Sequence, residues 1–122
     1  MSIQWFRLLK LKIHAFFGDV AALHQLGAVY ACYPIKGLSQ EERNRIAVKY
    51  YRKGAKLGNA FCQYDLAFML ILKEAETEDG GEEIRRLLEN SAAQQHQEAI
   101  KLLEDINIIG IAEFRKSCQA GR

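Results

Sequence analysis

Five cations within one short stretch of the chain have the residue type and the spacing needed to bind an acidic surface. Arg45, Lys49, Arg52 and Lys56 are separated by four, three and four residues, and Lys53 lies beside them. On a helix this spacing places the first four along one face, with Lys53 adjacent. Like charges at this spacing destabilise a helix by about 0.2–0.5 kcal/mol per pair. Helix stability therefore does not explain the cations, which favours a function for them in binding an acidic partner. The alternative is a solvated face whose charges are offset by carboxylates of the next segment, Glu74, Glu76 or Glu83.

Side chains suited to acid–base, nucleophilic or metal chemistry form no recognisable pattern. The histidines His14, His24 and His96 show neither an HExxH motif nor paired metal-ligand spacing. The cysteines are distant from one another and odd in number, which provides neither a CxxC pair nor a complete disulfide set: Cys32, Cys62 and Cys118. GxSxG, P-loop and GxGxxG motifs are absent from the sequence. We therefore predict no enzyme, no metal and no cofactor, and a cytoplasmic protein with reduced thiols.

The elements that must position the cations are indicated by an internal repeat. The block Gly18–Tyr30 recurs forty positions later as Gly58–Leu70. In each copy a glycine that can end a helix in the left-handed conformation precedes an N-capping residue, Asp19 or Asn59. A period of this length is typical of stacked helical units. Each Gly–Asp or Gly–Asn pair therefore predicts a tight turn between two helices.

A third, degenerate unit follows. Ser91–Gln95 resembles Gly54–Gly58 at a spacing of 37 residues, with Gln95 in place of the turn glycine, and Ala99 corresponds to Cys62. Between the first two units, Tyr33–Leu38 contains the single proline and a glycine, which predicts a loop. A capping box formed by Ser39 and Glu42 predicts the next helix, over about 40–57.

Length and composition favour one all-α domain. The chain has 122 residues, is 49% hydrophobic and contains nine glycines, and its many Ala, Leu, Glu, Lys and Gln residues favour helix. We predict a helical repeat solenoid over residues 1–122, built from two to three helix-turn-helix units. The approximate repeats are residues 3–32, 39–74 and 80–106, followed by a short C-terminal capping helix over 107–118.

The apolar segment Ile3–Phe17 is interrupted by cations and is shorter than the roughly 20 residues of a membrane span. We interpret it as a core-facing helix. The alternative is an amphipathic helix in a membrane interface, because Arg7, Lys10 and His14 are spaced i, i+3 and i+7 on one face.

Charge is divided unevenly along the chain. Residues 1–56 carry ten basic and three acidic side chains, a net charge of +7, whereas residues 57–122 carry seven basic and twelve acidic ones, a net charge of −5. The acidic half would repel phosphate, and no recognition motif accompanies the basic stripe, so nucleic acid is not the expected partner.

The chain resembles the Sel-one-like repeats, relatives of the tetratricopeptide repeat. The residues that carry the resemblance are Ala47, Tyr50–Lys53, Ala55, Gly58–Ala60, Gln63–Tyr64, Leu66 and Met69 in the middle unit, and Gly18–Asp19, Ala22, Leu26–Gly27 and Tyr30 in the first. The resemblance implies a right-handed stack of helix pairs that binds another protein and carries no chemistry.

Small members of such families include immunity proteins, which bind and neutralise a cognate bacterial toxin or effector. By this analogy we expect one protein partner with an acidic surface, such as a toxin, docked on Arg45, Lys49, Arg52, Lys53 and Lys56. The alternative is a regulatory adaptor or assembly factor that binds a cellular protein.

Overall fold

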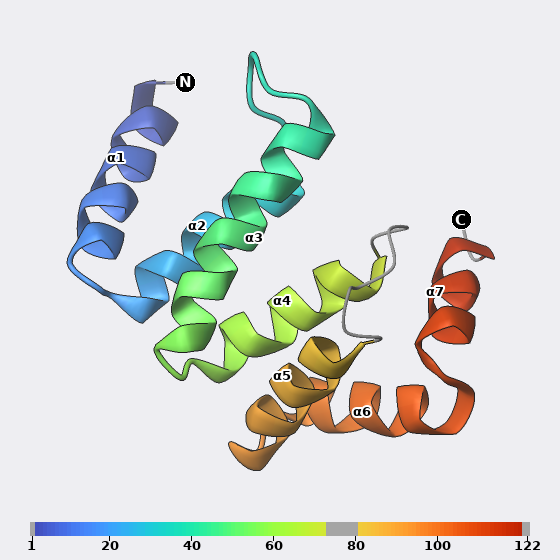
Figure 1. The fold of residues 1–122 in the computed structure, drawn as a ribbon. Coiled ribbons are helices and arrows are strands. Elements are labelled where there is room, and N and C mark those ends of the chain that lie inside the picture. Colours follow the sequence, from blue (N-terminus) through green and yellow to red (C-terminus); the bar gives the residue numbers. More distant parts are fainter. Residues whose placement is uncertain (1, 73–80, 121–122) are drawn as a thin grey trace. The chain divides into compact units, whose positions relative to one another are not determined.

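A computed structural model of the chain describes residues 2–72 and 81–120, with side chains described from residue 5 onward. The described residues form seven α-helices joined by turns and contain no strand, so the all-α prediction is confirmed (Figure 1). Contacts divide the chain into two compact units, residues 1–62 and 63–122. The predictions of a single domain with three repeats and of a solenoid stay predictions, and we describe each unit by itself.

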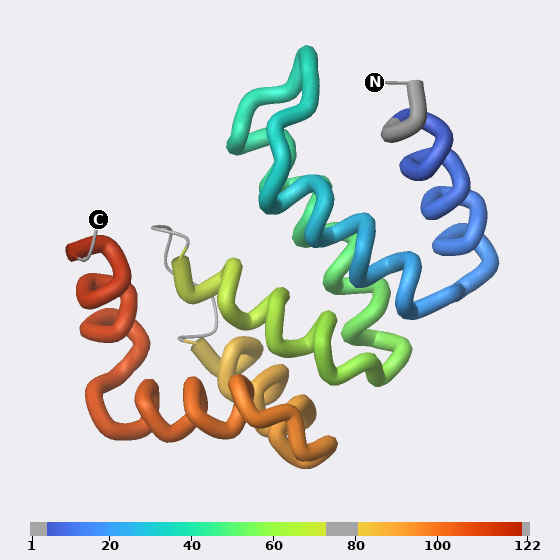
Figure 2. Tube along the Cα trace, turned by 180° about the vertical axis from the view of Figure 1, so that it is seen from behind, coloured from blue at the N-terminus to red at the C-terminus, as the bar shows by residue number. Residues whose placement is uncertain are grey.

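The first unit contains α1 (Ser2–Phe16), α2 (Val20–Cys32), α3 (Gln40–Lys56) and the first turn of α4 (Ala60–Leu72). Helix α2 contacts both α1 and α3, and it crosses behind α3 in Figure 1 and in front of α3 in Figure 2. Its contact with α3 is close: a Cβ added at Gly27 would overlap the ring of Tyr51. The predicted loop over residues 33–38 and the helix that follows it are confirmed by the end of α2 and the start of α3.

The two predicted glycine turns of the first unit have the same geometry. Gly18 and Gly58 adopt positive φ angles of 84° and 88°. The next residue then caps the following helix: the Asp19 carboxylate accepts hydrogen bonds from the amides of Ala21 and Ala22, and the Asn59 side chain accepts one from the amide of Cys62 (2.9 Å). Both turns were predicted from the sequence and are confirmed.

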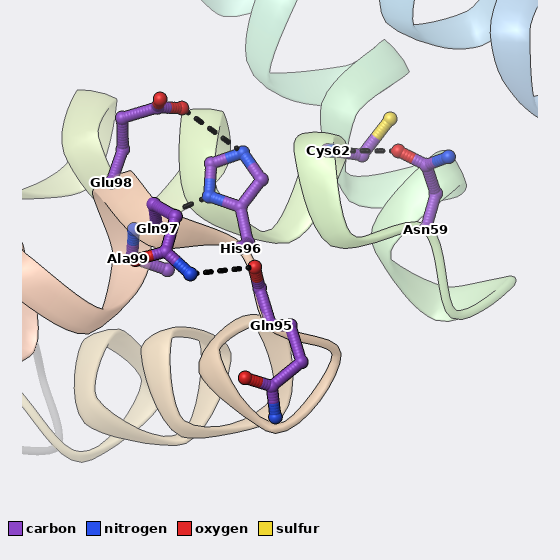
Figure 3. Close-up of polar contacts among 7 residues, drawn as sticks. All are labelled: Asn59, Cys62, Gln95, His96, Gln97, Glu98 and Ala99. Carbon is purple, nitrogen blue, oxygen red and sulfur yellow. Dashed lines mark hydrogen bonds and ion pairs between the residues drawn. The ribbon is translucent and has the colours of Figure 1, made fainter.

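The second unit contains the rest of α4, together with α5 (Glu82–Ala93), α6 (Gln97–Ile109) and α7 (Ile111–Ala120). Its turn between α5 and α6 repeats the glycine turns with other residues (Figure 3). Gln95 takes the left-handed conformation with φ 66°, and the Nδ1 atom of His96 accepts the amide hydrogen of Ala99 at 3.2 Å. Gln95 therefore replaces the turn glycine, as the sequence comparison predicted, and His96 replaces the capping Asp or Asn.

Packing around His96 explains why an imidazole can cap a helix here. His96 is buried, and its ring lies 5.0 Å from the ring of Tyr64, centroid to centroid. Because Nδ1 accepts a hydrogen bond, the proton of the neutral ring lies on Nε2, which is 3.3 Å from the Glu98 carboxylate (Figure 3). Burial raises the pKa of the Tyr64 hydroxyl, and the nearby carboxylates of Asp65 and Glu98 raise it further.

One predicted helix boundary and one packing prediction need correction, and the boundaries between the second and third repeats lie outside the described residues. The terminal helix was predicted over 107–118, but α6 continues to Ile109 and α7 begins at Ile111, because Gly110 turns the chain with φ 85°. The segment 3–17 was predicted to face the core. Ala15 is indeed buried, but most large apolar side chains of α1 are exposed. The predicted end of the second repeat at residue 74 and the predicted start of the third at residue 80 lie outside the described residues.

Candidate protein-binding face

The five predicted binding residues lie on one face of α3 within the first unit. Helix α3 is continuous from Gln40 to Lys56, so the spacing of the cations places them together as predicted. Arg45, Lys49, Lys53 and Lys56 are exposed, and Arg52 is half-buried. We call these five residues the α3 cationic face.

Local sequence explains how the two ends of α3, the helix that carries the cations, are stabilised. The Ser39 hydroxyl accepts the amide hydrogen of Glu42 at 3.1 Å and lies 3.1 Å from the Glu42 carboxylate, to which it donates. This interaction begins the helix as a variant of the capping box, since the Glu42 side chain contacts the serine hydroxyl. At the other end, Lys53 and Lys56 lie in the last turn, where a cation interacts favourably with the helix dipole.

Four of the five cations of the α3 cationic face form no ion pair with a carboxylate that the structure describes. No ion pair joins Arg45, Lys49, Lys53 or Lys56 to any carboxylate within residues 5–72 and 81–120. Of the carboxylates predicted to offset these charges, Glu74 and Glu76 lie outside the described residues. The four side chains therefore offer unpaired positive charge to solvent over the described part of the molecule.

Two tyrosines anchor the buried side of α3 to its neighbours. The rings of Tyr50 on α3 and Tyr30 on α2 stack at 5.9 Å, and the Lys12 ammonium lies 5.9 Å from the centre of the Tyr30 ring. Burial raises the pKa of the Tyr50 hydroxyl, an effect that Lys12 opposes. Stacking of this kind fixes the rotation of α3 about its axis, and with it the direction of the α3 cationic face.

Arg43 has a structural role that the sequence did not reveal. Its guanidinium donates to the backbone carbonyls of Tyr33 (2.7 Å) and Tyr30 (3.3 Å) and so satisfies acceptors at the C-terminal end of α2. Although Arg43 contributes to the charge of the basic half, it belongs to the fold and not to the α3 cationic face. Only its position in the first turns of a helix that follows a short loop could have suggested this contact.

The residues considered for chemistry occupy separate places. His24 packs between the rings of Tyr51 and Phe61, at 5.9 and 5.6 Å. His14 is exposed, 3.8 Å from the Asp19 carboxylate, and His96 caps α6. No group of three His, Cys, Asp or Glu side chains within the described residues could hold a metal ion.

The three cysteines form no disulfide: Cys32 is exposed, Cys118 is half-buried and Cys62 is fully buried. The interpretation of Cys62 as a buried hydrophobe is confirmed, because its exposed fraction is 0%.

A groove between α1 and α2 has a volume of about 350 Å³. Arg7, Lys10 and His14 line one side, and Asp19, Ala22 and Gln25 line the other. Its charges are mixed, and no pattern in the sequence indicated the groove.

Comparisons with protein-family models, with curated proteins and with solved structures give no match to this chain. The resemblance to the Sel-one-like repeats therefore stays a prediction, carried by the residues named above.

Proposed function

We propose that this chain is a non-catalytic protein-binding scaffold whose α3 cationic face docks on an acidic surface of one partner protein. The observation that carries the proposal is the set of four exposed cations on one helix face without a carboxylate partner among the described residues. If these side chains served only to stabilise the helix, opposite charges would be expected to alternate at these positions. Complementary charge across an interface speeds association and excludes partners of the same sign.

More concretely, we propose an immunity protein that neutralises a cognate bacterial toxin by occluding its acidic surface in the cytoplasm. Support comes from the Sel-one-like resemblance, from the helix pairs joined by three equivalent turns, and from the fixed orientation of α3. We propose that the helix pairs stack as a right-handed solenoid, so that the binding face is rigid before the partner arrives. A preformed face lowers the entropic cost of association.

Affinity capture from the native organism followed by kinetics on the purified pair tests this function. A partner that is toxic when expressed alone and harmless when co-expressed with this chain supports immunity. Several abundant housekeeping partners would favour the adaptor instead and would overturn the immunity proposal.

The interface itself is tested by reversing the charge of two exposed, unpaired lysines. The variant Lys49→Glu/Lys56→Glu should lower the association rate constant by about tenfold or more at low salt and flatten its dependence on ionic strength. The matched control is Lys36→Glu/Lys101→Glu, which makes the same charge change at two exposed lysines that are not part of α3. Equal association rates for the two variants would refute the assignment of the α3 cationic face.

A further inference from the structure

The exposed side of α1 carries an apolar surface that the α3 cationic face does not explain. Six large apolar side chains on α1 and in the turn after it are between 40% and 81% exposed: Trp5, Phe6, Leu9, Ile13, Phe16 and Phe17. At 100° per residue, Trp5, Leu9, Ile13 and Phe16 form one continuous stripe along the helix. We call these six residues the α1 apolar stripe.

Aromatic pairs occupy both ends of the α1 apolar stripe. Trp5 and Phe6 meet edge to face at 5.2 Å, and Phe16 and Phe17 do so at 5.3 Å. Eleven residues separate Trp5 from Phe16, which corresponds to about 16 Å along a helix axis. Anchors at both ends suit a surface that receives the helix lying flat, and they do not suit a small pocket that receives one end.

The charged side chains of α1 itself have one sign. Residues 2–16 contain Arg7, Lys10 and Lys12 and no Asp or Glu. Arg7, Lys10 and His14 lie on the polar side of the helix, toward the groove with α2, and Lys12 lies beside Trp5 and Phe16 in angular position. Aromatic side chains flanked by lysines, without acidic residues, complement a negatively charged apolar boundary.

Length decides how such a helix can meet a bilayer. Fifteen residues of helix are about 22 Å long, less than the roughly 30 Å of a hydrocarbon core. Among the described residues, no helix is both long and apolar enough to cross a membrane. Insertion of α1 is therefore restricted to the interface, with the apolar side chains below the headgroups and the lysines beside the anionic lipids.

From these observations we infer that α1 docks on the surface of an anionic lipid bilayer through the α1 apolar stripe, parallel to the membrane plane. Charge complementarity with the anionic headgroups is the observation that selects this occupant. The binding is reversible and weakens at high ionic strength, because part of it is electrostatic. It is independent of the proposed protein partner, since the apolar side chains of α1 take no part in the α3 cationic face.

Trp5 is the single tryptophan of the chain and therefore reports directly on this surface. On titration with vesicles of 70% phosphatidylcholine and 30% phosphatidylglycerol, its emission should shift to shorter wavelength, and lipids brominated on their acyl chains should quench it. Vesicles of phosphatidylcholine alone should bind about tenfold or more weakly, because three cations of α1 lose their counter-charge. Circular dichroism of each variant below checks that it keeps its helical content.

A pair of matched double variants separates insertion from general hydrophobicity. Leu9→Ser/Phe16→Ser removes two side chains of the α1 apolar stripe that are 40% and 78% exposed, and should lower the partition coefficient by about tenfold or more. Ile109→Ser/Ile108→Ser removes two side chains of α6 that are 44% and 80% exposed, and should leave it unchanged.

Three outcomes would overturn the inference. The first is no binding to the anionic vesicles at low salt. The second is binding without a shift of Trp5 emission and with equal partition of both double variants, which would indicate electrostatic adsorption by other cations. The third is a shift that depends on protein concentration without lipid, which would indicate that the α1 apolar stripe joins two copies of the chain.

Discussion

The turn between α3 and α4 and the turn between α5 and α6 have the same backbone hydrogen bonds but different side chains. In the first, the amide of Asn59 donates to the carbonyl of Gly54; in the second, the amide of His96 donates to the carbonyl of Ser91. The caps differ likewise, an amide oxygen against an imidazole nitrogen. The comparison teaches that the backbone path of this turn is retained while the chemistry that stabilises it changes.

Packing beside the two turns differs in a reciprocal way. Gly54 has no side chain, and a Cβ there would overlap the Sγ atom of Cys62. At the corresponding positions of the α5–α6 turn, Ser91 has a side chain and Ala99 has lost the sulfur, and both residues are fully buried. The first residue of the pair is therefore larger in the α5–α6 turn and the second is smaller. The summed side-chain volume of the pair is similar in the two turns, although both residues differ.

The largest expected effect comes from breaking this volume balance. Gly54→Ala should lower the free energy of unfolding by about 1–3 kcal/mol through overpacking against Cys62. Helix propensity alone would predict the opposite sign, a gain of up to about 1 kcal/mol. Chemical denaturation followed by circular dichroism measures the difference.

A double-mutant cycle with Cys62→Ala provides the control for this prediction. Gly54→Ala/Cys62→Ala should recover at least about 1 kcal/mol relative to the sum of the single changes, because the smaller side chain makes room for the new methyl group. Greater stability of Gly54→Ala than of the wild type, or strict additivity of the two changes, would contradict the close contact.

A smaller effect is expected from removing the caps. His96→Ala should cost about 1–2 kcal/mol, through the lost acceptor for the amide of Ala99 and the lost ring contact with Tyr64. His96→Asn keeps an acceptor and loses only the ring contact, so its unfolding free energy should lie between those of His96→Ala and the wild type. Hydrogen exchange at the Ala99 amide gives the local measurement. Equal exchange in all three proteins would show that the imidazole does not cap α6.

The smallest effect is expected at the left-handed residue of the α5–α6 turn. Gln95→Gly should raise the free energy of unfolding by about 1 kcal/mol, because glycine adopts φ 66° without a Cβ penalty. The neighbouring change Gln94→Gly is the control, since φ is −93° there. It adds freedom to the unfolded chain and also removes the hydrogen bonds that the Gln94 side chain donates to Gln63 (3.0 Å) and to the Asn90 carbonyl (3.4 Å). The melting temperature should rise for the first variant and fall for the second. A fall for both would mean that Gln95 contributes a contact worth more than its strain.

Local signals explain the parts of the fold that the sequence predicts. Turns such as Gly18–Asp19 are encoded within six residues, and the cations of α3 fall on one face wherever that helix forms. The end of α6 was missed because the apolar residues around Gly110 continue the helical pattern across it. Exposure of α1 was missed because an apolar stripe is the same in sequence whether another helix covers it or not. Whether carboxylates pair with the α3 cationic face also depends on residues distant in the chain.

Arginine contacts at two helix ends bear on the order in which the chain can fold. Arg43 reaches carbonyls only ten and thirteen residues back, so the end of α2 can be closed as soon as the first turns of α3 exist. Arg115 of α7 donates to the carbonyl of Ile71 near the end of α4, across 44 residues. Closing so long a loop is slower, so the last turn of α4 should gain its protection only after α7 has formed. During synthesis on the ribosome, the first unit can therefore fold before α7, the final helix of the second unit, has been made.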